Sequence, residues 1–200
     1  SLRRFAHYDY WSDTVRPSIL VESGADFLMY GMGEHSITEK AARLRYGEPI
    51  SSLTDIRGTC YLTDPVNTPW GAVQCPDFAQ VASDKKAYAK ATRQQYDQQD
   101  EIYGKTVIQR HGKQMLVQNP PALSLTQEEL DAVYQLPFQR KPHPMYDAQG
   151  GVPGIAEVQF SIAHNRGCFG YCNFCSIALN QGRRVTCRSE ESILKEAKQI

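Results

Sequence analysis

The pattern of hydrophobic and polar positions is clearest in the first third of the chain. Residues 26–30 form a short, almost continuous apolar run before Gly31, which is typical of a buried strand in a parallel sheet. Residues 34–46 follow a helical period and end at Gly47, a residue type that commonly terminates helices. The apolar face of this helix would contain Ile37, Ala41 and Leu44. With strands also predicted at 53–56 and 59–62, the order predicts a βαβ unit of a doubly wound sheet.

The middle of the chain predicts helices and a hairpin. A long helical pattern extends over residues 78–103, with Val81, Tyr88, Tyr96 and Tyr103 on its apolar face. Residues 106–110 and 114–118 flank His111-Gly112-Lys113, which is typical of a β-hairpin. Thr126 and Glu129 have the spacing of a capping box, which predicts a short helix ending near Tyr134.

The last third predicts a strand, a loop and a helix. Residues 137–153 are rich in Pro and Gly and are expected to form a linker or an extended arm. Residues 155–163 alternate in a way that predicts a strand. After a cysteine-containing loop, Ser189 is a candidate N-cap of a terminal helix. The apolar face of that helix would contain Ile193, Ala197 and Ile200. Loops that follow strands and precede helices are where α/β barrels place their chemistry.

The predicted fold class is therefore α/β, in three parts. Residues 1–65 would form part of a doubly wound domain, 66–150 a helical and hairpin insertion with a Pro-rich linker, and 151–200 a strand–loop–helix unit of the kind that α/β barrels contain. The chain begins without methionine, and its last helix has no C-cap glycine. We therefore expect an internal fragment of a longer protein. An exposed barrel edge on such a fragment would favour a homodimer.

Charge and composition exclude several functional classes. The 22 basic and 22 acidic residues give a formal net charge of zero, which argues against a protein that grips nucleic acid or an anionic membrane through bulk charge. The apolar runs are far shorter than the roughly 20 residues that a membrane-spanning helix needs. The N-terminal residues contain no apolar signal-peptide segment. The sequence predicts a soluble, cytoplasmic protein.

Three of the six cysteines, Cys168, Cys172 and Cys175, share one short segment with the spacing C-x3-C-x2-C. Clustered thiolates suit zinc, Cu(I) or an iron–sulfur cluster. Structural zinc sites normally have four protein ligands, and the next candidates, Cys187 and His164, have unhelpful spacing. Three cysteines on a four-iron cluster would leave one iron open to a substrate or cofactor. That count favours the cluster over zinc.

Other candidate residues have simpler interpretations. Cys187 is expected to be a small buried hydrophobic residue, and Cys60 and Cys75 are expected to be core or near-surface thiols. The Gly31–Glu34 segment is expected to be a tight turn with Glu34 at a helix N-terminus, because it lacks a complete phosphate-binding motif. Four arginines surround the cysteines and would either balance a negatively charged cluster or form a solvated basic face: Arg166, Arg183, Arg184 and Arg188.

The cysteine motif, with Phe174 directly before its last cysteine, resembles the signature of the radical S-adenosylmethionine (radical SAM) superfamily. The context resembles more closely the YgiQ-type iron–sulfur oxidoreductase family. The resemblance to the cysteine region of that family lies in residues 160–162, 166–170, 181–183 and 188–194. The resemblance to the region ahead of its core lies in residues 3–13, 30–34 and 54–59.

The resemblance implies that Cys168, Cys172 and Cys175 each ligate one iron of a 4Fe-4S cluster. The fourth iron would bind S-adenosylmethionine, and reduction by an electron donor protein would generate a 5′-deoxyadenosyl radical that acts on an unassigned substrate. Phe174 matches the aromatic position beside the adenine; the alternative is a core aromatic under the loop. The resemblance also implies that the third part begins a radical SAM (β/α) barrel and that the first part is similar to nucleotide- or cobalamin-binding domains.

Three hypotheses follow from these patterns. The first is a fragment of a radical SAM enzyme, active in the whole protein but not alone. The second is a zinc-stabilised or redox-inert binding module. The third is a folded accessory fragment whose cysteine loop stays empty and which has no activity of its own.

Overall fold

The computed structural model describes residues 3–200, which form two compact units. The first unit contains the chain up to Ser124 together with Cys168–Arg183, and the second contains Leu125–Gly167 together with Arg184–Ile200. No helix within residues 3–200 has the length and apolar character needed to cross a bilayer. The cysteine loop is therefore part of the same unit as the large sheet.

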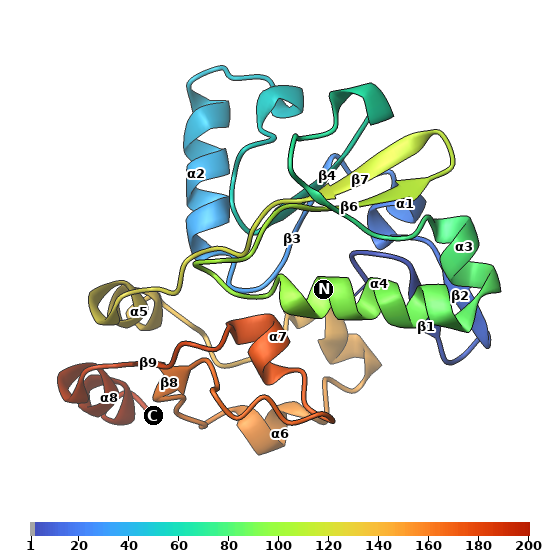
Figure 1. Cartoon of the computed structure of the whole chain (residues 1–200). Helices are drawn as coiled ribbons and strands as arrows, with labels where there is room; N and C mark the ends of the chain where they lie inside the picture. The colour runs from blue at the N-terminus through green and yellow to red at the C-terminus, as the bar shows by residue number, and fades with distance from the viewer. Residues whose placement is uncertain (1–2) are drawn as a thin grey trace. The chain divides into compact units, whose positions relative to one another are not determined.

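A mixed five-stranded sheet is the centre of the first unit (Figure 1). Its strand order is β3 (Phe27–Met29), β4 (Thr59–Thr63), β7 (Gln114–Gln118), β6 (Val107–His111) and β5 (Val73–Gln74). In this sheet β5 and β6 pair in parallel, and the other three pairs are antiparallel. The α/β class is confirmed, and so is the β6–β7 hairpin.

The prediction of a parallel βαβ unit is wrong for this sheet. The strand, turn and helix do occur in the predicted order, as β3, Gly31 with a φ of 70°, and α2 (Glu34–Arg45). However, β4 pairs antiparallel to β3, with Phe27 opposite Tyr61. The predicted strand at 53–56 is instead irregular chain after the 3-10 helix Ile50–Ser52, and that segment returns the chain to the sheet in the opposite direction.

Helix α2 buries a different face from the predicted one. Ile37 and Leu44 are 47% and 41% exposed, whereas Ser36 and Lys40 are buried. Ser36 Oγ donates a hydrogen bond of 2.7 Å to the Arg57 carbonyl. The helix therefore contacts the irregular chain after it through polar side chains, which an apolar pattern does not reveal.

The remaining elements of the first unit surround this sheet. The predicted helix over 78–103 is two helices, because Asp84 ends the first and its side chain accepts a hydrogen bond from the Lys86 amide to cap the second. The bounds are β1 (His7–Asp9), β2 (Thr14–Arg16), α1 (Ile19–Ser23), 3-10 helix Pro65–Asn67, α3 (Phe78–Ser83), α4 (Lys85–Asp97) and α7 (Ile177–Gln181).

The core of the first unit contains two of the cysteines. Cys60 and Cys75 are fully buried free thiols, as predicted, and burial raises the pKa of each to about 12. His111 at the end of β6 stacks on Phe78, with ring centroids 5.5 Å apart, and burial lowers its pKa to about 4. These thiols and this imidazole are therefore uncharged at neutral pH.

The second unit contains the helices α5 (Gln127–Tyr134), α6 (Ile155–Val158) and α8 (Glu190–Ala197), the 3-10 helix Pro144–Gln149 and the two-stranded sheet β8 (Asn165–Arg166) with β9 (Thr186–Cys187). The capping box of Thr126 and Glu129 and the N-cap Ser189 are confirmed. The strand predicted over 155–163 is wrong, since this segment begins as α6 after hydrogen bonds to the Val152 and Pro153 carbonyls. A strand needs a neighbouring strand to pair with, and none pairs with this segment within residues 3–200.

A buried ion pair takes the place of the predicted apolar face of α8. Arg188 and Glu196 are both buried and paired, and Arg140 also pairs with Glu196. Burial by itself would raise the pKa of Glu196, but the hydrogen bonds from Arg188 and Arg140 outweigh this effect and lower the pKa. The helix thus turns Ser192 and Glu196 inward, while Ala197 and Ile200 are exposed.

Candidate metal centre

The cysteine loop, residues 168–182, is closed at its base by a backbone hydrogen bond. The Cys168 amide donates to the Gly182 carbonyl at 3.1 Å, directly after α7. Within the loop, the Gly170 amide donates to Cys168 Sγ at 3.4 Å, and the Cys175 amide donates to the Cys172 carbonyl at 2.9 Å. These hydrogen bonds fix the backbone of the loop around Cys168 and between Cys172 and Cys175.

Tyr171 fastens the loop to helix α4. Its ring lies edge-on to the ring of Tyr96, with centroids 4.6 Å apart, and the guanidinium of Arg183 lies 3.9 Å from the Tyr171 centroid. Tyr171 has a φ of 49°, a left-handed conformation that side chains other than glycine rarely adopt. The strain is offset by these ring contacts, and it is located directly before Cys172.

The three cysteines share a loop, and two of the sulfurs have a common neighbour. A Cβ atom added at Gly170 would lie 3.5 Å from Cys168 Sγ and 3.7 Å from Cys172 Sγ. All three are free thiols; Cys168 and Cys175 are half-buried, and Cys172 is exposed. Within residues 3–200, no group of three or more His, Cys, Asp or Glu side chains is gathered closely enough to hold a metal ion.

The donor set fits an iron–sulfur cluster by the chemistry of its thiols, not by their present geometry. Three accessible thiols on one loop are the soft ligands that such clusters use. A side chain at the glycine between the first two would be in van der Waals contact with both of their sulfurs. The sulfurs of Cys168 and Cys172 both lie near Gly170. The three cysteines do not form a metal-binding group within residues 3–200.

Phe174 lies on the surface of the loop, with 92% of its side chain exposed. The alternative of a core aromatic under the loop is wrong. Phe169, two residues before Tyr171, is 85% exposed as well. The loop thus presents two uncovered aromatic rings next to its thiols.

Of the four arginines near the cysteines in the sequence, Arg183 and Arg184 are exposed and Arg188 is buried, and a role in balancing a cluster stays a prediction. Arg188 is buried in the ion pair with Glu196, and the guanidinium of Arg166 lies 5.8 Å from the Tyr134 ring centroid. Arg183 is held over Tyr171, as described above. The prediction that Cys187 is buried is wrong, because the short edge strand β9 leaves its side chain exposed.

Sequence reasoning missed Tyr96 and Tyr171 as positioning residues. Tyr96 was visible only as one of several apolar positions on a predicted helix. Tyr171 has no spacing that connects it with Tyr96, 75 residues earlier. The contact follows from the tertiary structure of the first unit.

We expect Tyr96→Leu to loosen the cysteine loop. An aromatic pair contributes about 1 kcal/mol beyond its buried area, and losing it would raise the open population of the loop roughly fivefold. Residue-resolved alkylation read by mass spectrometry should show the half-buried thiols Cys168 and Cys175 reacting up to that much faster. The matched control is Tyr103→Leu, because Tyr103 is 83% exposed. The exposed Cys187 provides an internal reference, and equal rates of Cys168 and Cys175 in both variants would contradict this role of Tyr96.

Comparison with known proteins adds a family relationship. The sequence model described as "Radical SAM N-terminal" matches residues 1–161. A UPF0313 protein of Clostridium botulinum is 51% identical over 98% of this chain and 30% of its own length. A UPF0313 protein of Methanocella arvoryzae is 51% identical over all of this chain and 33% of its own length, and one of Clostridium perfringens is 49% identical over all of this chain and 30% of its own. No solved structure matches this chain. The chain spans about a third of the length of these curated relatives.

Proposed function

This chain belongs to the radical SAM N-terminal family, and we propose that its three-cysteine loop holds a 4Fe-4S cluster and S-adenosylmethionine in the whole protein. The observation that carries the proposal is the set of three free thiols on one loop, which is closed at Gly182 and fastened to α4. When bound, such a cluster supplies an electron to cleave the sulfonium of S-adenosylmethionine, which yields a 5′-deoxyadenosyl radical able to abstract hydrogen from a substrate.

In that reaction the residues of this chain would bind the cluster and cover the nucleoside. Cys168, Cys172 and Cys175 would each provide one thiolate, and the Gly170 amide would stabilise the Cys168 sulfur by its hydrogen bond. Phe174 is exposed next to Cys175 and would cover the adenine of the nucleoside. Arg183 lies over the ring of Tyr171, which has a φ of 49°, and this contact would help to orient Cys172.

The rest of the whole protein would complete the enzyme. We propose that it supplies the strands of a radical SAM barrel, the substrate site and the surface for an electron donor protein. The division of this chain at residues 65 and 150, the likeness of its first part to cobalamin-binding domains, and a cytoplasmic location all stay predictions.

A second candidate is a metal-free accessory role for the 200 residues alone. It is favoured by the observation that residues 3–200 do not gather three ligands at one point. In that case the missing barrel would bring Cys175 to the other two sulfurs. The isolated chain would then remain colourless with free thiols, whereas the whole protein would bind iron.

Anaerobic reconstitution of the whole protein with iron and sulfide tests the proposal. We expect about four irons per chain and the visible absorption band of a thiolate-ligated cluster. Reduction in the presence of S-adenosylmethionine should release 5′-deoxyadenosine. Stoichiometric zinc in a colourless protein would overturn the cluster assignment.

A further inference from the structure

A second candidate site lies between α2 and the edge of the sheet. It is a cavity of about 230 Å³ in the first unit, formed by residues of β3, α2, β4 and the segment after α2. Its walls include Phe27, Lys40, Leu53, Tyr61 and Leu62, with Asp26 at the rim. None of the lining residues belongs to the cysteine loop, so this cavity is separate from the proposed cluster site.

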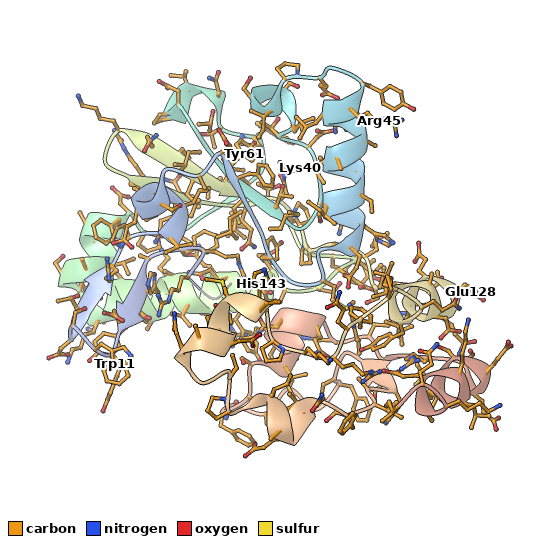
Figure 2. The ribbon with its side chains drawn as sticks, turned by 180° about the vertical axis from the view of Figure 1, so that it is seen from behind. Trp11, Lys40, Arg45, Tyr61, Glu128 and His143 are labelled. Atoms are coloured by element: carbon orange, nitrogen blue, oxygen red, sulfur yellow. The ribbon has the colours of Figure 1, made fainter. Side chains whose placement is uncertain are left out.

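Lys40 is the unusual residue of this cavity. It is only 1% exposed, and Figure 2 shows it on α2, close to Tyr61. Its Nζ atom lies 3.4 Å from the centroid of the Phe27 ring and donates one long hydrogen bond, also of 3.4 Å, to the Leu53 carbonyl. Both of these partners line the cavity, so the ammonium lies at its wall.

The charge of Lys40 has no counterion. Within residues 3–200 Lys40 forms no ion pair: Asp55 is held by Arg43, one turn later on α2, and Asp26 acts on the ammonium without reaching ion-pair distance. Arg43 pairs with Glu48 at 2.6 Å and with Asp55 at 2.8 Å. An ammonium has three donors, and at most two are used here, one of them on an aromatic ring.

Burial of an unpaired ammonium is costly unless a partner compensates it. Burial, together with the positive charge of Arg43, lowers the pKa of Lys40, while Asp55 and Asp26 act in the opposite direction. A buried lysine that has no ion-pair partner in the protein can instead pair with the anionic group of a bound ligand.

We propose that the cavity binds a small organic monocarboxylate whose anionic group pairs with Lys40. The ligand's apolar body would lie against Leu53 and Leu62, and burial raises the pKa of the Tyr61 phenol, so that it stays a hydrogen-bond donor. At about 30 Å³ for each water, the volume equals about eight waters, which suits a short-chain or single-ring acid. This site is independent of the proposed function of the cysteine loop.

The charges of the cavity favour one negative charge over two. Lys40 is the only cation among its lining residues, and Asp26 would repel a second negative charge at the rim. Arg43, the next cation along α2, is already paired with three carboxylates. A phosphate or a dicarboxylate would therefore lack a partner for part of its charge.

The proposal is tested by titrating the 200-residue chain with butyrate. The amide chemical shifts are measured in two-dimensional NMR spectra at each butyrate concentration. We expect saturable shifts at Phe27, Leu53 and Tyr61. Lys40→Met should weaken the binding of butyrate at least tenfold, and Lys40→Gln, which keeps a polar side chain without charge, should do the same. The matched control is Lys86→Met, an exposed lysine on α4 outside the cavity, which should bind butyrate as the unchanged chain does.

Two further probes separate the charge from the apolar body. 1-Butanol, which has the same chain without the carboxylate, should bind at least tenfold more weakly than butyrate. Inorganic phosphate should produce no saturable shifts at these three amides. The proposal is overturned by equal binding of butyrate and butanol, by binding of phosphate alone, by unchanged binding in the Lys40 variants, or by the absence of saturable shifts with butyrate.

Discussion

Replacing Cys172 with alanine is expected to remove the iron from the whole protein. A cluster held by three thiolates loses one of its ligands in the Cys172→Ala variant. The loop contains no fourth cysteine that could replace it. The iron content after anaerobic reconstitution should fall from about four per chain to near zero. The absorption band of the cluster should disappear with it. Cys168→Ala and Cys175→Ala should behave in the same way.

The chain offers a matched control for this experiment. Cys187 is also an exposed free thiol, but it lies on β9 in the second unit, beyond the loop closed at Gly182. Cys187→Ala should keep the full iron content and the absorption band. If Cys187→Ala lost the iron, or if Cys172→Ala kept it, the ligand set proposed here would be incorrect.

Gly167→Ala is expected to unfold the segment that leads into the cysteine loop. Gly167 has a φ of 87°, and a Cβ atom there would lie 1.9 Å from the Arg184 carbonyl oxygen, 2.7 Å from its carbonyl carbon and 3.3 Å from Val185 Cα. All three are backbone atoms next to β9, so the clash cannot be relieved by a side-chain rotation. Backbone strain of this kind costs about 1–3 kcal/mol, and the displacement of the strand adds to it. We expect a loss of about 3 kcal/mol or more in stability.

Gly170→Ala is the control for this prediction. Gly170 has no positive φ, and its added Cβ would make ordinary van der Waals contacts with two sulfurs. Its effect on stability should be below about 1 kcal/mol. Hydrogen exchange of the amides around β8 and β9 would measure the difference. Similar protection in the two variants would show that the backbone at Gly167 can adjust to a side chain.

The elements that were predicted correctly are those with local causes. The β6–β7 hairpin depends on a glycine turn with a φ of 61° at Gly112, and α5 and α8 begin at the predicted caps Thr126 and Ser189. Turn and cap hydrogen bonds involve residues that are close in the sequence. Their energies are therefore readable from the order of residues.

The incorrect predictions concerned partners that are distant in the sequence. A run such as 26–30 is apolar whether its neighbour is parallel or antiparallel, and only the return path through 50–58 decides that β4 pairs antiparallel to β3. The buried faces of α2 and α8 contain Lys40 and Glu196, whose burial depends on Phe27 and on Arg188. The apolar period therefore predicted a different buried face for each helix.

For the candidate site, the order of residues alone established the three thiols and their close spacing, since C-x3-C-x2-C is a property of one short loop. The tertiary structure decided what holds that loop, namely Tyr96 against Tyr171 and Arg183 over its ring. It also decided that Lys40 lies buried beside a cavity without a counterion. The reason is physical: thiol chemistry is local, whereas burial, ring stacking and the absence of a countercharge exist only once distant segments meet.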